Sequence, residues 1–263
     1  MATGAGWWLG LGSLALVQAL APALPVAAQT AAPPQAASEE EEHHALPEGP
    51  LSDTDYATAL RLVLGHLDVG GELAAQGAWN DALPHFAHPA EELYPVIGPE
   101  LARRGAAPFD RELDALLGRA KARDGGPGLA EADARARAKV AAALAALPPA
   151  TADDPGHMAE VAINLVHGAA EEYEEAFADG RLVAPVEYQD GRGFVAEAGR
   201  LVAEREAALA RADPARFEAL RQHLAALDAI WPTPLPPATP GGDTDRAWSL
   251  VMQVESDAGG FRD

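Results

Sequence analysis

The chain has 263 residues, enough for one sizeable domain or two small ones, and a formal net charge of −21 from 19 Lys and Arg against 40 Asp and Glu. So acidic a surface repels nucleic-acid phosphates and anionic lipid head groups, which leaves cations, basic proteins and uncharged molecules as partners. The sequence has no cysteine, which excludes disulfides, thiolate nucleophiles, Cys-ligated metal clusters and the attachment motif of c-type haem. An apolar share of 48% with only 6% aromatic residues indicates an Ala-rich helical core.

Residues 1–28 are typical of an export signal peptide. An uncharged apolar run extends from Trp7 to Val26, and small residues at Val26 and Ala28 frame a cleavage point before Gln29. An uncleaved membrane anchor is the alternative, but two glycines and two prolines interrupt the run, and a spanning helix needs about 20 consecutive apolar residues. We therefore predict export to a periplasm. Residues 29–50 follow as a disordered acidic linker.

The folded part is predicted to be an all-α bundle of about six or seven helices over residues 51–230. Its first helix should run from about Asp53 to Gln76, with Ser52 and Asp55 as a capping box. Glycines in this helix indicate either a close approach of another helix or a break after Val69. The next segment, 78–94, carries His85, His88 and Glu92 on one face if the helix is continuous, whereas Pro89 favours a fresh start.

The later helices are marked by prolines, glycines and capping residues. Asp154 and Pro155 predict the start of a helix that ends near Phe177, and Asp179 with Gly180 predicts its stop. Further helices are expected over 108–123, 129–147, 185–212 and 214–230. Residues 231–263 read as a Pro-rich tether with one short helix over 248–254, which either docks on the bundle or frays.

The helix that ends near Phe177 carries a polar stripe. Glu160, Asn164, His167, Glu171 and Glu174 follow one another at intervals of four, three, four and three residues, which puts them on one face. Such a stripe either holds a cation against a second helix or forms an ordinary hydrated surface.

The two halves of the chain share a faint pattern. In each half a helix with His and Glu ends at a small-residue turn and is followed by a Pro-x-Glu helix start, at Pro89 and at Pro185. Two such hairpins facing each other would form a four-helix core with inward polar groups, as in carboxylate–histidine metal sites of helical bundles.

Histidines with nearby carboxylates are the candidate metal ligands. Imidazole and carboxylate donors suit iron, manganese, zinc and Cu(II). The candidates are His66, His85, His88, Glu91, Glu92, His167, Glu171 and Glu187.

Two stretches resemble known families. The segment from Glu172 to Tyr188, with Glu172-Tyr173, Ala176-Phe177, Asp179-Gly180 and Glu187-Tyr188, resembles the periplasmic N-terminal region of bacterial high-affinity iron permease proteins. More weakly, His88-Pro-Ala-Glu91 is similar to the His-x-x-Glu motif of the imelysin family, exported helical proteins linked to iron uptake. The chain lacks the Arg-Glu-x-x-Glu motif of iron permeases, so the resemblance implies a stand-alone soluble companion with iron-related work in the periplasm.

We therefore predict a periplasmic metal-binding protein of an uptake or handling system, which holds a transition-metal ion by His and Glu on facing helices. Iron is the favoured ion, Cu and Zn are the other candidates, and a membrane iron permease is the expected partner. The sequence leaves the oligomeric state open. An enzyme is not expected, because neither a Gly-x-Ser-x-Gly elbow nor a His-Glu-x-x-His motif occurs. The alternative is a non-catalytic acidic adaptor that partners a membrane transporter without a metal site.

Overall fold

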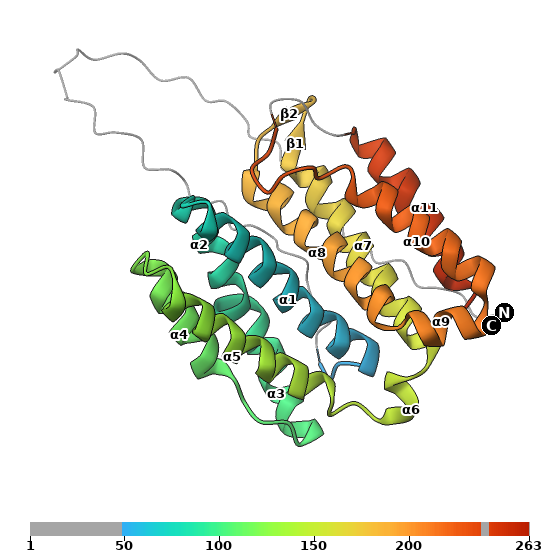
Figure 1. The fold of residues 1–263 in the computed structure, drawn as a ribbon, viewed down its shortest axis with the longest axis horizontal. Helices are drawn as coiled ribbons and strands as arrows, with labels where there is room; N and C mark the ends of the chain where they lie inside the picture. The colour runs from blue at the N-terminus through green and yellow to red at the C-terminus, as the bar shows by residue number, and fades with distance from the viewer. Residues whose placement is uncertain (1–48, 238–241, 263) are drawn as a thin grey trace, which may run out of the picture. The chain divides into compact units, whose positions relative to one another are not determined.

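The computed structural model describes residues 49–237 and 242–262, and these residues are almost entirely helical. The predicted signal peptide and nearly all of the predicted linker lie outside the described residues. The elements, labelled as in Figure 1, are α1 (Asp53–Ala75), α2 (Trp79–His88), the π-helical turn η1 (Pro89–Leu93), α3 (Tyr94–Arg104), α4 (Asp110–Lys121), α5 (Pro127–Leu144), α6 (Pro149–Ala152), α7 (Pro155–Ala176), β1 (Phe177–Ala178), β2 (Arg181–Leu182), α8 (Pro185–Glu204), α9 (Glu206–Ala212), α10 (Pro214–Asp228) and α11 (Thr244–Gly259). The predicted all-α class is confirmed.

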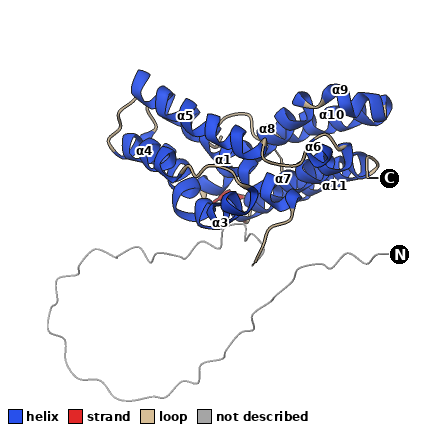
Figure 2. Ribbon diagram, turned by 90° about the horizontal axis from the view of Figure 1, so that it is seen from below, coloured by secondary structure: helices blue, strands red, loops and turns tan. Residues whose placement is uncertain are grey.

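Two groups of helices meet along α1 and α8. The helices α7, α8, α10 and α11 pack as a four-helix bundle, and the helices α1 to α5 pack beside it (Figure 1). Seen from below, α4 and α5 lie at one end and α9, α10 and α11 at the other (Figure 2). The contact between α1 and α8 is the main connection between the groups, and α1 also contacts α7.

Side-chain caps confirm the predicted helix starts at Ser52 and Asp154. The Ser52 hydroxyl accepts a hydrogen bond from the backbone N–H of Asp55 at 3.0 Å, and the Asp154 carboxylate accepts one from His157 N–H at 2.9 Å. Asp179 and Gly180 adopt positive φ angles of 53° and 69° and form the two-residue turn between β1 and β2. The predicted helix over 185–212 is interrupted, because Arg205 leaves helical geometry between α8 and α9.

The two alternatives left open in α1 and at Pro89 are both decided. Helix α1 continues past Val69, so its glycines mark no break. Gly65 and Gly70 pack closely against Gly193 and Phe86, whereas a Cβ on Gly71 would meet no atom within 4 Å. The chain also continues through Pro89, because α2 passes into the π-helical turn η1 and then into α3. A π-helical turn absorbs the proline without ending the helix.

The C-terminal helix docks on the bundle and covers the polar stripe of α7. It is longer than predicted, and it packs against α7 and α10. Trp248 donates its indole N–H to Glu174, and His167 lies 3.2 Å from Glu255. The stripe is therefore in part a packing face, while Glu171 and Glu174 stay exposed. In the described part of the chain no helix combines the length and the hydrophobicity that a membrane crossing needs.

A buried ion-pair network stabilises the contact of α1 with α8. The Arg61 guanidinium is almost fully buried, lies 2.6 Å from the inaccessible Glu197 carboxylate and 2.9 Å from the half-exposed Glu204. Arg200 bridges Glu197 to Asp68. We expect Glu197→Gln to lower the free energy of unfolding by about 3 kcal/mol, because it removes one charge from a buried pair.

Glu204→Gln is the matched control, since it removes the exposed partner of the same arginine. Glu204→Gln should lower the free energy of unfolding by less than about 1 kcal/mol. Urea unfolding of both variants measures the difference, and equal losses would contradict a dominant role for the buried pair.

Candidate metal centre

Three histidines meet between α1, α2 and α8. His66 comes from α1, whereas His85 and His88 are one turn apart on α2. The ring centroids are 5.1 Å apart for His66 and His88, 6.2 Å for His85 and His88, and 6.3 Å for His66 and His85. All three rings are buried, and Phe194 packs edge-on against His66.

Asp190 of α8 is the carboxylate that faces all three rings. Its Oδ1 lies 2.7 Å from Nδ1 of His66 and 2.7 Å from Nδ1 of His85. Its Oδ2 lies 3.2 Å from Nδ1 of His88. The carboxylate is 1% exposed, so these imidazoles replace the water that a free carboxylate would bind.

The contacts within this cluster are close but only partly have hydrogen-bond geometry. Nδ1 of His85 makes a hydrogen bond to Asp190, and its Nε2 lies 2.8 Å from Oε1 of Gln189. Nδ1 of His66 lies 2.7 Å from Oδ1 of Asp190, and Nδ1 of His88 lies 3.2 Å from Oδ2, both within ion-pair distance. Imidazole nitrogens and a carboxylate that converge in this way could also hold one metal ion.

A second group of carboxylates adjoins Asp190. Glu172 of α7 and Glu187 of α8 are buried, and both offer oxygens that lie within 4.8 Å of one another and of an Asp190 oxygen. One oxygen of Glu172 and one of Glu187 make no hydrogen bond. Asp190 thus belongs to both groups, one with His66 and His85 and one with the two glutamates.

Burial and mutual charge move the pKa values of these groups in opposite directions. Burial would raise the pKa of Asp190, but the charges of His66 and His85 outweigh burial and hold it well below its usual range. Burial lowers the pKa of His66. Burial also raises the pKa of Glu172 well above its usual range, and a hydrogen bond with Glu187 and the charge of Asp190 add to the rise.

Helix periodicity and two glycines place these side chains. Glu187 and Asp190 are three residues apart and therefore share a face of α8. A Cβ atom on Gly193 would lie 2.5 Å from the Gly65 carbonyl oxygen, and one on Gly191 would lie 2.8 Å from the Ala169 oxygen. Only glycine lets α8 approach α1 and α7 this closely, next to the ligand atoms.

The structure brings together four of the eight predicted ligands, namely His66, His85, His88 and Glu187. The carboxylate of Glu92 stands at the edge, 4.0 Å from Nε2 of His88.

The other three predicted ligands lie apart from the cluster. Glu91 is exposed and pairs with Lys121 at 3.3 Å. Glu171 is exposed on α7. His167 packs edge-on against Trp248.

Sequence reasoning did not single out Asp190 and Glu172. Asp190 had a usable signal, since it follows Glu187 by three residues on a helix and the two must share a face. Glu172 is one position beyond Glu171 and so lies about 100° further round α7, on the side that faces α8.

The metal-free protein should lose stability as the pH rises through the range in which Glu172 ionises. The pKa of Glu172 is raised in the folded state, so its stabilising effect is complete below the unfolded pKa near 4.5 and disappears as the pH passes the folded pKa. Glu172→Gln, which mimics the protonated acid, should be the more stable protein at pH 8 and should lack this slope. Thermal melts of both proteins in EDTA from pH 5 to 8 test this prediction. Melting temperatures that change with pH in the same way in both proteins would contradict it. Glu171→Gln is the exposed control.

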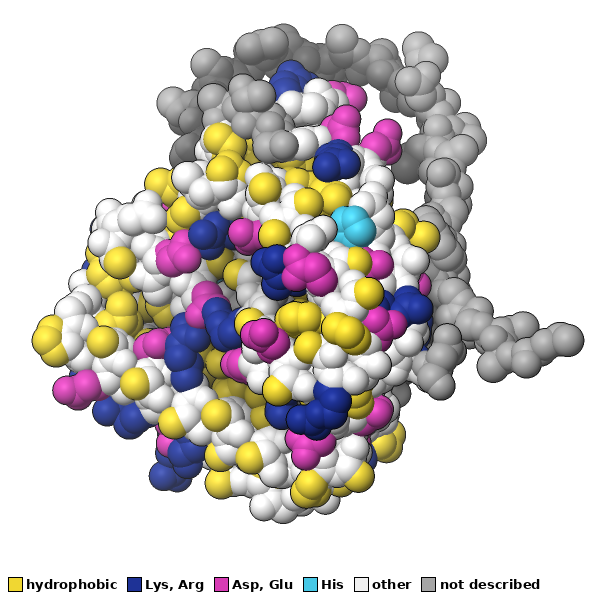
Figure 3. Space-filling view, turned by 45° about the vertical axis from the view of Figure 1, so that its right-hand side comes forward, with side chains coloured by type: hydrophobic (Ala, Val, Ile, Leu, Met, Phe, Trp, Pro, Cys, Tyr) yellow, Lys and Arg dark blue, Asp and Glu magenta, His cyan; other side chains and the backbone are white. Residues whose placement is uncertain are grey.

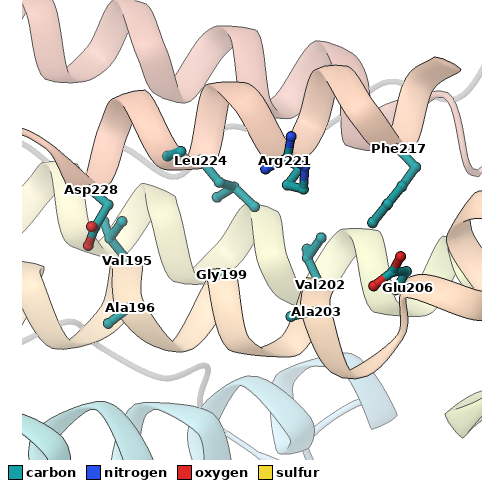
Figure 4. Close-up of a pocket in the computed structure, with 11 residues that line it drawn as sticks. Val195, Ala196, Gly199, Val202, Ala203, Glu206, Phe217, Arg221, Leu224 and Asp228 are labelled. Atoms are coloured by element: carbon teal, nitrogen blue, oxygen red, sulfur yellow. The ribbon is translucent and has the colours of Figure 1, made fainter. Parts of the chain in front are cut away.

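The hollow between α8 and α10 carries little of this chemistry. A cavity of about 410 Å³ lies between α8 and α10 and is lined mainly by apolar side chains such as Val195, Val202 and Phe217 (Figure 4). Its charged residues, Glu206, Arg221 and Asp228, lie at the rim among exposed groups. The face in Figure 3 intersperses acidic and basic side chains with apolar ones.

The described residues thus define an all-α protein with a histidine–carboxylate cluster buried between a four-helix bundle and the helices beside it. Residues 148–260 match the family model of the iron permease-associated 4-helix bundle domain. The matched range is less than half of the chain, and it contains both the four helices α7, α8, α10 and α11 and the segment from Glu172 to Tyr188 that carries the resemblance.

The chain therefore resembles iron permease-associated proteins, as predicted. Neither the curated proteins nor the solved structures gave a match. The similarity to the imelysin motif stays a prediction. The three clustered histidines lie outside the matched range, whereas Glu172, Glu187 and Asp190 lie within it.

Proposed function

We propose that this protein binds a transition-metal ion, iron above all, through His66, His85, His88 and Asp190, and that it serves iron uptake or handling in a periplasm. The observation that carries the proposal is the convergence of three buried imidazole Nδ1 atoms on one carboxylate, at 2.7, 2.7 and 3.2 Å. Nitrogen and oxygen donors of this kind suit Fe, Mn, Zn and Cu(II).

The choice of iron rests on the matched domain, whose description associates it with iron permeases. A soluble companion that hands ions to such a permease would need a site that opens and closes at low cost. The cluster lies where α1 and α2 meet α8, so a small movement of one helix group would change the ligand set. The periplasmic location rests on the predicted signal peptide.

The rival function is an acidic adaptor without a metal site. An adaptor would place its histidines outward and present an exposed apolar patch. Here His66, His85 and His88 point inward and are buried, which favours the metal-binding function. We propose binding without turnover.

Calorimetric titration of the metal-stripped full chain with Fe(II) under anaerobic conditions, Fe(III), Cu(II) and Zn(II) tests the proposal. We expect saturable binding with proton release, since imidazoles must be deprotonated to bind a metal. His66→Ala with His85→Ala should abolish it, whereas His167→Ala, on the α11 side of α7, should leave it unchanged. Absence of saturable binding, or binding that the double variant retains, would leave the adaptor function.

A further inference from the structure

The carboxylate group formed by Glu172, Glu187 and Asp190 has more buried negative charge than its surroundings compensate. The three residues are 5%, 3% and 1% exposed, and their oxygens lie within 4.8 Å of one another. Burial of these carboxylates in their charged form is costly unless a cation pairs with them.

The neighbouring basic residues do not supply that cation. Arg192, on the same helix, pairs with Glu72 at 2.9 Å, and Arg61 and Arg200 are held by Glu197. Within the ranges that the structure describes, no salt bridge joins Lys or Arg to Glu172 or Glu187. One carboxylate oxygen of Glu172 and one of Glu187 are buried and make no hydrogen bond.

Asp190 is placed to serve two ions at once. Its Oδ1 lies 2.7 Å from Nδ1 of His66 and of His85, and its Oδ2 lies 3.2 Å from Nδ1 of His88. One of its oxygens also lies within 4.8 Å of oxygens of Glu172 and Glu187. A carboxylate that lies between two groups of possible ligands can bridge adjacent cations, and bundles commonly hold such pairs between facing helices. Gly191 and Gly193, which follow Asp190 on α8, bring α7 and α1 close enough for both ligand groups to share one residue.

We propose that the centre holds two metal ions, one on the histidine side and one on the carboxylate side formed by Glu172 and Glu187, with Asp190 shared between them. This inference rests on the proposed function. The carboxylate side has only oxygen donors and suits the harder ions, such as Mn²⁺ or ferric iron, whereas the imidazole side suits borderline ions such as Fe²⁺ and Zn²⁺. The two sides would therefore differ in preference for the oxidation state of iron.

The test is the stoichiometry of Mn(II) bound to the full chain after equilibrium dialysis, together with its EPR spectrum. We expect two equivalents per chain and the broadened spectrum of two coupled ions. The variant Glu172→Gln with Glu187→Gln should bind one equivalent and give the six-line spectrum of an isolated ion. Glu171→Gln with Glu204→Gln makes the same change at exposed positions of α7 and α8 and should keep two.

The outcomes separate the two proposals. If the unchanged protein binds one equivalent of Mn(II), and Glu172→Gln with Glu187→Gln also binds one, the proposal of a second ion is overturned while the single-ion function stands. No saturable Mn(II), Fe(II) or Zn(II) would overturn both. If the control variant Glu171→Gln with Glu204→Gln loses one equivalent of Mn(II), the two-ion proposal is also overturned, because the second ion would then belong to the acidic surface. Circular dichroism melts show that each variant is folded before it is compared.

Discussion

Asp190→Asn should remove most of the stabilisation that we expect metal to give this protein. Asp190 contacts His66, His85 and His88 and is shared by both ligand groups, so its loss removes a charge and a donor from each. We expect affinity to fall by about 100-fold or more, since even residues that only orient metal ligands contribute 10- to 100-fold. At a metal concentration of about 100 times the dissociation constant, stabilisation would fall from about 2.7 to about 0.4 kcal/mol.

Thermal melts with and without metal measure this effect directly. Most of the metal-dependent shift should be lost in Asp190→Asn, whereas His167→Ala should shift as the unchanged protein does. A variant that is destabilised without metal but retains its metal-dependent shift would show that Asp190 only completes a structural network. Affinity within about threefold of the original would likewise contradict a ligand role, given the magnitude expected for a direct donor.

Gly193→Ala should weaken both the fold and the centre. Its methyl group would lie 2.5 Å from the Gly65 carbonyl oxygen and 2.8 Å from the carbonyl carbon, and backbone atoms of a packed helix cannot yield locally. Helices α1 and α8 must separate, which should cost about 2–3 kcal/mol of unfolding free energy. Because His66 is on α1 and Asp190 on α8, metal affinity should fall as well.

Gly199→Ala is the matched control on the same helix. A Cβ atom there meets no atom within 4 Å, so the variant should gain about 0.5–1 kcal/mol from the better helix propensity of alanine. Urea unfolding and metal titration of both variants give the comparison. Similar stability of Gly193→Ala and Gly199→Ala would show that the helices adjust without loss, and that close approach is not what positions the centre.

The sequence predicted the helices well because their signals are local. Caps at Ser52 and Asp154 and the stop at Asp179-Gly180 depend on residues within one turn of the helix end. The break between α8 and α9 at Arg205 and the continuation of α2 through Pro89 were harder to predict. Packing against other helices decides whether a chain bends or stays helical at such positions.

The candidate centre was only partly predictable for a related reason. Local spacing indicates which residues share a helix face, and so it singled out His85 with His88 and placed Glu187 near a possible site. It also favoured the stripe of α7 with His167, because nothing in the sequence shows that α11 returns to cover that face.

The amino-acid sequence by itself determined an acidic all-α protein without thiol chemistry, with ligand-type side chains in both halves, because charge, composition and helix periodicity are properties of the chain alone. Only the tertiary structure decided which of those side chains meet. The close approach of α8 to α1 and α7 at Gly193 and Gly191 buries Asp190 and Glu172 beside the histidines, and that contact joins residues more than 100 positions apart.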